Sequence, residues 1–224
     1  MSRCPRRHLV LWCDDRCHRL QHWEPRSVSN ALTALNVEHQ VLSTPLAGSP
    51  KIDTYVLPGV GAADVTMASL RSAGWDSFLA DRLSEGAKYL GICIGMQIMF
   101  GGSEEGDTEC LGWLPGSVAR LDRDSVRVPQ MGWNTVAVTE NAPKGINLVD
   151  QGYYYYVNSY YARCDARDLY GVTDYGEAVP AVVGRKNMIG VQFHAEKSGV
   201  LGLQLLKSLF APSGDNSAWD VDLA

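Results

Sequence analysis

Cys93 lies in the run Gly91-Ile92-Cys93-Ile94-Gly95-Met96-Gln97, which could carry a nucleophile. A buried strand over 88–92 is expected to end there, and a helix over 96–100 to follow. Flanking glycines let a strand-to-helix turn pack tightly and lift the middle side chain to the edge of a sheet. The sulfur then lies at a helix N-terminus, which favours the thiolate, the reactive form. The alternative is a small buried hydrophobic cysteine.

His194 and Glu196 could supply the base that such a nucleophile needs. They follow the apolar run 188–193, and residues two apart in an extended chain share a face. The carboxylate can hold the imidazole in one tautomer. The imidazole can then take the thiol proton and later protonate the leaving amine. A core histidine beside a solvated glutamate is the alternative for the pair alone. Together with Cys93, the pair predicts a Cys–His–Glu triad.

Two backbone segments could stabilise an oxyanion. The N–H of Ile94 follows the nucleophile, and the loop Pro58-Gly59-Val60-Gly61 follows another short apolar strand. We therefore predict oxyanion donors at Gly59, Val60 and Ile94. A dinucleotide-binding loop over 59–64 is the alternative, but it lacks the third glycine that packs helix against strand.

Composition narrows the classes of function. The chain has 224 residues, 46% of them hydrophobic, which suits one α/β domain with a sizeable core. A net charge of −5 and a pI of about 5.5 argue against nucleic acid as a partner. No apolar run approaches the roughly 18 residues that span a bilayer, and no secretory signal is recognisable. The six cysteines have no framework spacing, so we expect free thiols in the cytoplasm.

The positioning elements alternate between strand and helix in the first half. We expect strands at 8–12, 37–42, 54–57 and 88–92, with helices from Pro25 and over 75–83. This rhythm predicts an α/β fold with an open, mostly parallel sheet and helices on both faces. From Gly116 onward the pattern is β-rich, with strands at 117–121, 135–138, 153–157, 169–173, 181–183 and 188–193. A closing helix over 198–209 has Ser198 as its expected N-cap.

The expected domain organisation has three parts. Residues 1–24 form an atypical N-terminal strand and turn, 25–210 form the main domain, and 211–224 form a disordered tail because they are polar and acidic. Cys13, Cys17, His18 and His22 could bind zinc, but their spacing is irregular, and no metal is expected.

These pieces together resemble the class I, triad-type glutamine amidotransferases, which have a flavodoxin-like sheet. More narrowly, the segments 103–106, 111–116, 128–134, 154–161 and 192–198 resemble, in this order, the glutaminase subunits of imidazole glycerol phosphate synthase in histidine biosynthesis. The resemblance covers roughly residues 25–210. Its most specific parts are the Met-Gly-Trp-Asn element at 131–134 and the aromatic strand at 154–161.

The resemblance implies roles for individual residues and no cofactor. Cys93, His194 and Glu196 match the triad of the family. Gln97 and Glu105 would hold the amino end of L-glutamine. The backbone around Ser159 and Tyr160 would hold its α-carboxylate.

The resemblance also implies a heterodimer. Trp133, Tyr155 and Lys197 would face a (β/α)₈-barrel synthase, with core packing as the alternative for the two aromatic residues. Ammonia would pass through that barrel to a ribulosyl nucleotide, giving imidazole glycerol phosphate and an aminoimidazole carboxamide ribotide. Such glutaminases are typically weak until the partner and its ligand are bound.

The sequence departs from the family pattern at several positions. Gln130 and Asn158 stand where the family usually has histidine, and neither side chain can titrate near neutral pH. Ala195 stands where the family has proline. The segment 19–24, Arg-Leu-Gln-His-Trp-Glu, replaces a glycine-containing turn of the family, so the first turn cannot share the family's backbone.

Three other functions remain open from the sequence. The chain could be a paralogous glutaminase feeding another synthase, such as one that aminates a sugar for surface polysaccharide. It could be a stand-alone γ-glutamyl hydrolase that needs no partner. It could also be a non-catalytic binding module, although the intact triad weighs against this.

Overall fold

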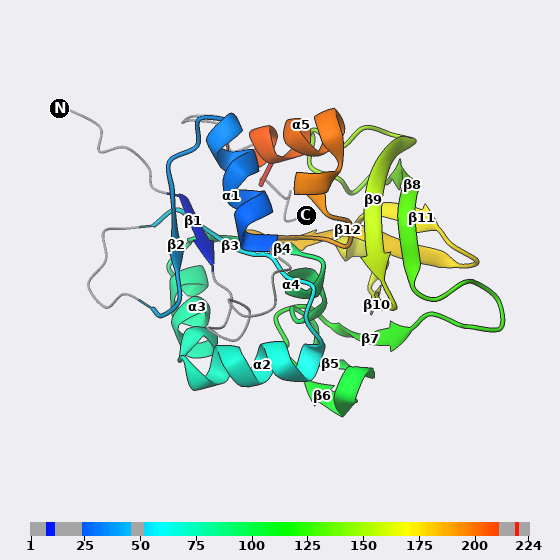
Figure 1. Cartoon of the computed structure of the whole chain (residues 1–224), viewed down its shortest axis with the longest axis horizontal. Coiled ribbons are helices and arrows are strands. Elements are labelled where there is room, and N and C mark those ends of the chain that lie inside the picture. Colours follow the sequence, from blue (N-terminus) through cyan, green and yellow to red (C-terminus); the bar gives the residue numbers. More distant parts are fainter. Residues whose placement is uncertain (1–7, 12–23, 46–51, 211–217, 220–224) are drawn as a thin grey trace.

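The computed structural model describes residues 8–11, 24–45, 52–210 and 218–219. Among these residues, nine strands form one sheet in the order β2-β1-β3-β4-β13-β12-β11-β8-β9 (Figure 1). The strands are β1 (His8–Leu11), β2 (His39–Leu42), β3 (Thr54–Leu57), β4 (Lys88–Ile92), β8 (Gln130–Val138), β9 (Gly152–Asn158), β11 (Leu169–Asp174), β12 (Ala178–Arg185) and β13 (Met188–Val191).

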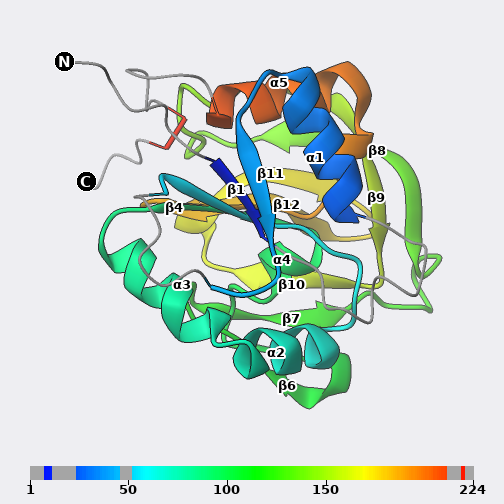
Figure 2. The same ribbon diagram turned by 60° about the vertical axis from the view of Figure 1, so that its left-hand side comes forward.

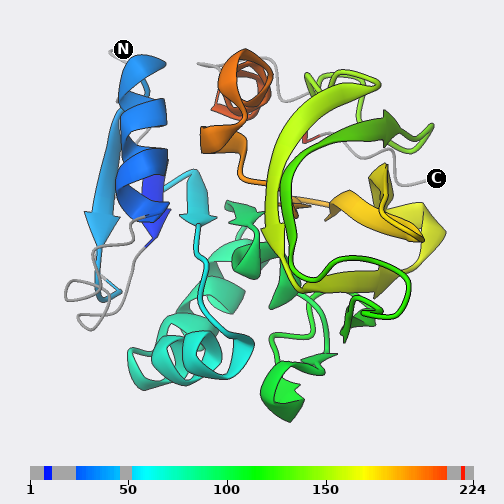
Figure 3. The same ribbon diagram turned by 45° about the vertical axis from the view of Figure 1, so that its right-hand side comes forward.

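The sheet has a parallel half and an antiparallel half. Strands β2, β1, β3, β4 and β13 pair in parallel, and β12, β11, β8 and β9 continue the sheet in antiparallel pairs. The antiparallel half curls strongly, as the long β8 and β9 show in Figure 3. Strand β9 is the last strand in the order and is therefore an edge strand of the sheet. The backbone groups on its outer edge are available to other segments.

Helices cover both faces of the parallel half. Helices α1 (Glu24–Ala34) and α5 (Gly199–Phe210) lie on one face, and α2 (Ala63–Ser72) and α3 (Trp75–Ser84) on the other (Figures 1 and 2). Each face of the sheet has its own hydrophobic core, and alternate residues of β3 point into the two cores. Val56 packs in the core with α1 and α5, and Tyr55 packs in the core with α2 and α3. This alternation is typical of a strand buried on both faces.

A small second sheet supports the end of the molecule where β4 stops. Its order is β10-β7-β5-β6. The strands are β10 (Tyr160–Cys164), β7 (Gly116–Arg120), β5 (Gly102–Ser103) and β6 (Thr108–Glu109), with short 3-10 turns η2 (Glu105–Asp107), η3 (Ala166–Asp168) and η4 (Ala195–Lys197) elsewhere in the chain. This sheet carries Tyr160 and leads directly into Glu105.

The predicted α/β class is confirmed. Two helices near Cys93 differ from the prediction. Helix α2 was not expected, because the sequence before it is a glycine loop and Ala62 provides no side-chain cap. The expected helix over 96–100 is instead α4 (Ile94–Gln97). It stops because the carbonyls of Ile98, Met99 and Phe100 accept hydrogen bonds from the backbone of residues 111–114.

The C-terminal expectations need two corrections. Ser198 does not cap α5 with its side chain: its hydroxyl donates to the His194 carbonyl at 2.6 Å and accepts from the Tyr155 N–H at 3.0 Å. The tail is packed at Ala218 and Trp219, which are buried, and the Trp219 indole donates to the Leu209 carbonyl. The four residues weighed as an alternative zinc site and the unusual segment 19–24 lie outside the described residues, except for Glu24 at the start of α1.

No helix within the described ranges is long and apolar enough to cross a membrane.

Candidate active site

Cys93 lies on a sharp bend between β4 and α4. Its backbone has φ 55° and ψ −108°, a conformation that residues with a side chain rarely adopt. The surrounding structure holds it there: the Cys93 N–H donates to the Val191 carbonyl at 2.8 Å, and its carbonyl accepts from Gln97. Strain that persists at one residue of a cavity marks a functional position.

Two glycines make this bend possible. A Cβ atom added to Gly91 would lie 2.4 Å from the Gly95 carbonyl oxygen, and one added to Gly95 would lie 1.9 Å from the Leu57 carbonyl oxygen. Both distances are far below van der Waals contact, so each position needs glycine. The predicted strand-to-helix turn with tightly packed glycines is therefore present.

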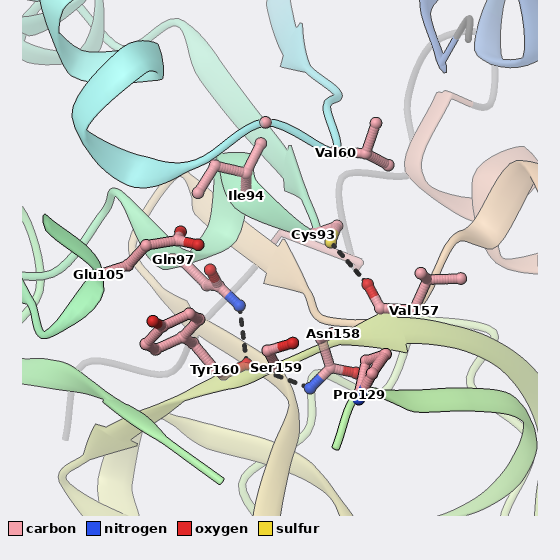
Figure 4. A pocket seen from close by; sticks show the side chains of 11 residues that line it. Val60, Cys93, Ile94, Gln97, Glu105, Pro129, Val157, Asn158, Ser159 and Tyr160 are labelled. Carbon is pink, nitrogen blue, oxygen red and sulfur yellow. Dashed lines mark hydrogen bonds between the residues drawn. The ribbon is translucent and has the colours of Figure 1, made fainter.

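The sulfur opens onto a cavity of about 230 Å³ (Figure 4). Cys93 is only 5% exposed and reaches solvent through this cavity. Seven predicted site residues line it: Val60, Cys93, Ile94, Gln97, Glu105, Ser159 and Tyr160. They come from four separate segments of the chain, so the fold brings together residues that are far apart in the sequence.

His194 and Glu196 form a buried pair directly after β13. Nδ1 of His194 lies 2.8 Å from Oε1 of Glu196, and both side chains are 0% exposed. An ionised carboxylate can only accept hydrogen bonds, so Nδ1 carries a proton, and in the neutral ring Nε2 keeps a lone pair. A neutral imidazole in this tautomer is suited to act as a general base.

The edge strand β9 brings the histidine and the cysteine to the same place. The His194 N–H donates to the Tyr155 carbonyl at 2.8 Å, and the Cys93 thiol donates to the Val157 carbonyl at 3.8 Å. These two carbonyls belong to residues two apart on one strand edge. In addition, β4 and β13 are parallel neighbours with Ile92 opposite Val191, so both residues follow the same end of the sheet.

The side chain of Gln97 is fixed by its own amide group. Its Nε2 donates to the Tyr160 carbonyl at 2.9 Å and to Oε1 of Gln192 at 3.0 Å. Both N–H groups of the amide are therefore used, which leaves Oε1 as an acceptor for a ligand.

Glu105 provides a carboxylate on the opposite side of the cavity. Its Oε2 accepts a hydrogen bond from the Ala63 N–H at 2.9 Å. Burial raises the pKa of Glu105; the Ala63 N–H lowers it, and the nearby Asp64 raises it again. The net direction is upward. Glu105 and Gln97 thus offer acceptors that suit a ligand ammonium group.

The Gly59–Gly61 loop packs on the residue after the nucleophile. Val60 and Gly61 line the cavity, and a Cβ added to Gly59 would lie 2.7 Å from Cγ2 of Ile94. The two predicted groups of oxyanion donors are therefore adjacent. The dinucleotide alternative is not supported, because a carboxylate rather than a phosphate occupies the first N–H of α2.

An exposed aromatic face lies on the β8–β9 pair. Trp133 is directly opposite Tyr155 in the register, with ring centroids 5.8 Å apart. Trp133 is 55% exposed, and its neighbours Met131 and Tyr153 are 66% and 60% exposed. Core packing does not account for Trp133. Lys197 is also exposed. Met131 and Tyr153 had no predicted role from the sequence.

Several residues at the site were missed from the sequence. Gln192 contacts the nucleophile, since its Nε2 lies 3.7 Å from the Cys93 sulfur. Pro129, Val157 and Asn158 line the cavity. Asn158 faces Gln130 in the β8–β9 register, and both side chains are buried. The two positions at which the family pattern has histidine are therefore neighbours in the structure. The signal for Gln192 was its place two residues before His194.

Two other described cysteines are poor nucleophiles. Burial raises the pKa of the Cys110 thiol and of the Cys164 thiol to about 11, and Cys164 also lies near the carboxylates of Asp168 and Asp165. Thiols of this kind are almost entirely protonated at neutral pH and react slowly. Neither residue lines the cavity.

Comparison with solved structures supports the fold. The chain superposes with a TM-score of 0.65 on a crystal structure of a glutamine amidotransferase, at 17% identity and covering 91% of this chain and 96% of that one. The TM-score with a chain of the PurLQS structure from Thermotoga maritima is 0.66, at 15% identity, covering 92% and 98%.

Proteins with similar sequences identify the family of the chain. The family model of class-I glutamine amidotransferases matches residues 30–211. Imidazole glycerol phosphate synthase subunit HisH from Oceanobacillus iheyensis is 39% identical over 184 residues, covering 81% of this chain and 90% of that protein. The HisH subunit from Dehalococcoides mccartyi is 41% identical over 187 residues, covering 83% and 90%. The chain therefore belongs to the class-I glutamine amidotransferases and, within them, to the family of the HisH subunits.

Proposed function

We propose that this chain hydrolyses L-glutamine to L-glutamate at Cys93 and delivers the ammonia to a (β/α)₈-barrel synthase of histidine biosynthesis. The observation that carries the proposal is the strained bend at Cys93, which points a sulfur into a cavity. The buried His194–Glu196 pair is held by the same strand, β9, that holds the sulfur. The cavity volume of about 230 Å³ suits a ligand the size of one amino acid.

The first half of the reaction forms a thioester. Nε2 of His194 takes the thiol proton, and the sulfur attacks the carboxamide carbon of glutamine. The carbonyl electron pair moves onto oxygen, where the N–H groups of Ile94 and Val60 stabilise the charge. The C–N bond then breaks as the imidazolium returns its proton to nitrogen, which leaves as ammonia.

The second half regenerates the thiol. His194 takes a proton from water while the water oxygen attacks the thioester carbon. The C–S bond breaks, the sulfur regains the proton from the imidazolium, and glutamate leaves. No electrons are gained or lost overall, so the cycle needs no cofactor. Glu196 keeps the same tautomer of His194 throughout and stabilises the imidazolium.

Substrate selection rests on charges at the far end of the cavity. Oε1 of Gln97 and the carboxylate of Glu105 accept hydrogen bonds from the α-ammonium group. Backbone N–H groups of Ser159 and Tyr160 bind the α-carboxylate. A substrate without either group would lose charge-assisted hydrogen bonds, each worth about tenfold or more in binding.

The partner docks on the aromatic face formed by Met131, Trp133, Tyr153, Tyr155 and Lys197. Aromatic residues that are solvent-exposed in one chain are characteristic anchors of protein interfaces. Because Tyr155 and Val157 also bind the catalytic segments through their carbonyls, the face lies directly next to the chemistry. Ammonia released at Cys93 would therefore have a short path to the synthase, which would form imidazole glycerol phosphate and aminoimidazole carboxamide ribotide.

The test is reconstitution with the histidine-pathway barrel synthase. The complex should form imidazole glycerol phosphate from the ribulosyl nucleotide with glutamine as the nitrogen source. Cys93→Ser should abolish the reaction with glutamine, while added ammonium chloride should still support it. Trp133→Ala should weaken the complex by about 10-fold or more. Val41→Ala, at an exposed position on the opposite sheet edge, should not.

Other outcomes would reassign the chain. Activation only by a different synthase would make it a paralogous glutaminase. Cleavage of γ-glutamyl peptides at full rate without a partner would make it a hydrolase. If neither glutamine nor glutamyl peptides were cleaved with any barrel partner, the enzymatic proposal would be wrong.

A further inference from the structure

Gln192 is a completely buried polar residue that contacts the nucleophile. It follows β13, the strand that pairs with β4, and its side chain is 0% exposed. Its Nε2 lies 3.7 Å from the Cys93 sulfur, within the range of an N–H···S hydrogen bond. A buried amide needs such partners, since leaving its groups unbonded is costly.

The sulfur has two neighbours that suit different protonation states. The Val157 carbonyl at 3.8 Å can only accept, so it binds the neutral thiol. The Gln192 amide at 3.7 Å donates, so it binds the thiolate more strongly than the thiol. When His194 removes the proton, the bond to Val157 is lost and the bond from Gln192 is strengthened.

The orientation of the Gln192 amide is fixed by a second amide. Its Oε1 accepts a hydrogen bond from Nε2 of Gln97 at 3.0 Å, so the Gln192 NH₂ group must point toward the sulfur. Gln97 in turn donates to the Tyr160 carbonyl, which also accepts from Nδ2 of Asn158 at 3.1 Å (Figure 4). A continuous relay of amides therefore runs from the substrate-binding turn to the sulfur.

We propose that Gln192 stabilises the Cys93 thiolate by direct contact, and that Gln97 is a positioning residue that aims the Gln192 amide at the sulfur. This inference rests on the proposed function, because it assigns Gln192 a role in activating the same nucleophile. It also gives Gln97 a second role beside substrate binding. The relay links the turn at Ser159–Tyr160, where glutamine would bind, to the reactivity of Cys93.

The test measures the nucleophile without glutamine. Alkylation of Cys93 by iodoacetamide is followed from pH 5 to 10 by peptide mass spectrometry, in the wild type and in Gln192→Met. Methionine has a similar length but no donor. The pH at which alkylation is half-maximal should rise by about one unit in the variant, which corresponds to a roughly tenfold loss of thiolate stabilisation. The kcat for glutamine should fall about tenfold with little change in KM.

The controls separate activation from folding. Gln204→Met makes the same change at an exposed position on α5 and should leave the profile unchanged. Gln97→Met keeps Gln192 but removes the bond that aims it, so a smaller upward shift is expected. The other titratable groups near the site, His194, Glu196 and Glu105, are retained in every variant. A difference between variants therefore reports on the amides.

A folded Gln192→Met variant with the wild-type alkylation profile would overturn the proposal. If that variant does not fold, a Gln97→Met profile identical to the wild type would do the same. Failure of the proposed function would be distinguishable, because alkylation reports on Cys93 even if glutamine is not the substrate.

Discussion

Oε1 of Glu196 lies 2.8 Å from Nδ1 of His194, and both side chains are fully enclosed by protein. A buried carboxylate is expensive unless it is paired, and here the ring N–H supplies the pairing. The pair therefore fixes which nitrogen of His194 carries the proton. The role of this pair can be tested by a substitution that replaces one carboxylate oxygen of Glu196 with an amide NH₂ group.

Glu196→Gln should reduce kcat for glutamine by about 10²- to 10⁴-fold with little effect on KM, because the amide keeps the shape but no longer holds the tautomer or stabilises the imidazolium. Steady-state kinetics and a thermal melt of the same preparation check this. Glu140→Gln, at an exposed position, is the matched control. A kcat near that of the wild type would remove Glu196 from the triad.

A glutamine-mimicking electrophile should label Cys93 in preference to Cys110 and Cys164. At pH 7.5 a thiol with a pKa of about 11 is thiolate in only roughly 3 molecules in 10⁴. Intact-mass and peptide analysis give the site and the stoichiometry, and Cys93→Ser identifies adducts formed elsewhere. Selective labelling of Cys110 or Cys164 would contradict the assignment.

Val60→Pro should lower kcat by about 10²- to 10³-fold, because proline has no N–H to offer the oxyanion. Val60→Ala keeps the N–H and is the matched control, expected within a few-fold of the wild type. Since Val60 lines the cavity and is about half exposed, neither change creates a void in the core. Equal activities of the two variants would show that this loop donates nothing to the reaction.

The KM for glutamine should rise on the acid side as Glu105 is protonated. Burial raises the pKa of this carboxyl, so its charge is present above that pKa and is lost as the pH falls through it. The rise should begin at a higher pH than for an ordinary glutamate. Glu105→Gln should have a KM about tenfold higher or more, without this acid limb.

The control for that experiment is Glu109→Gln, whose side chain is 86% exposed. Its KM should follow the wild-type curve across the pH range. If Glu105→Gln retained the wild-type pH dependence of KM, the ammonium-binding role would belong to another residue.

Gly95→Ala should destabilise the fold by about 3 kcal/mol or more, because the new methyl group would lie 1.9 Å from the Leu57 carbonyl oxygen. Gly101→Ala is the matched control: its Cβ would lie 3.4 Å from the Gly116 carbonyl oxygen, an ordinary contact. Urea denaturation of both variants measures the free energy of unfolding. Equal stabilities would mean that the bend relaxes without cost.

The sequence predicted the elements whose signals are local. Strands β3 and β4 match their expected ranges, and the face of α1 marked by Val28 and Leu32 is buried as the periodicity indicated. The bend at Cys93 was predictable because glycines on both sides of a residue restrict what the backbone can do. Gln97, Glu105, Ser159 and Tyr160, which the family resemblance implied as substrate contacts, line the cavity, whereas His194 and Glu196 are not among its lining residues.

The missed features depend on partners distant in sequence. The contact of Gln192 with the sulfur exists because β13 pairs with β4, which no local pattern reveals. The end of α4 is set by the segment 111–114, whose N–H groups donate to the carbonyls of residues 98–100 directly after the helix. Trp219 is buried although the residues around it are polar and acidic, because its indole reaches Leu209 on α5.

Strand β9 carries binding and chemistry on one backbone. Its side chains Tyr153 and Tyr155 belong to the aromatic face, while its carbonyls at Tyr155 and Val157 hold His194 and Cys93. If the synthase docks on this face as proposed, a displacement of β9 on association would move both carbonyls and with them the proposed base and nucleophile. Mutations in β9 that adapted this face to a new partner would then also change the catalytic rate. Partner binding and catalysis would therefore have to evolve together in this strand.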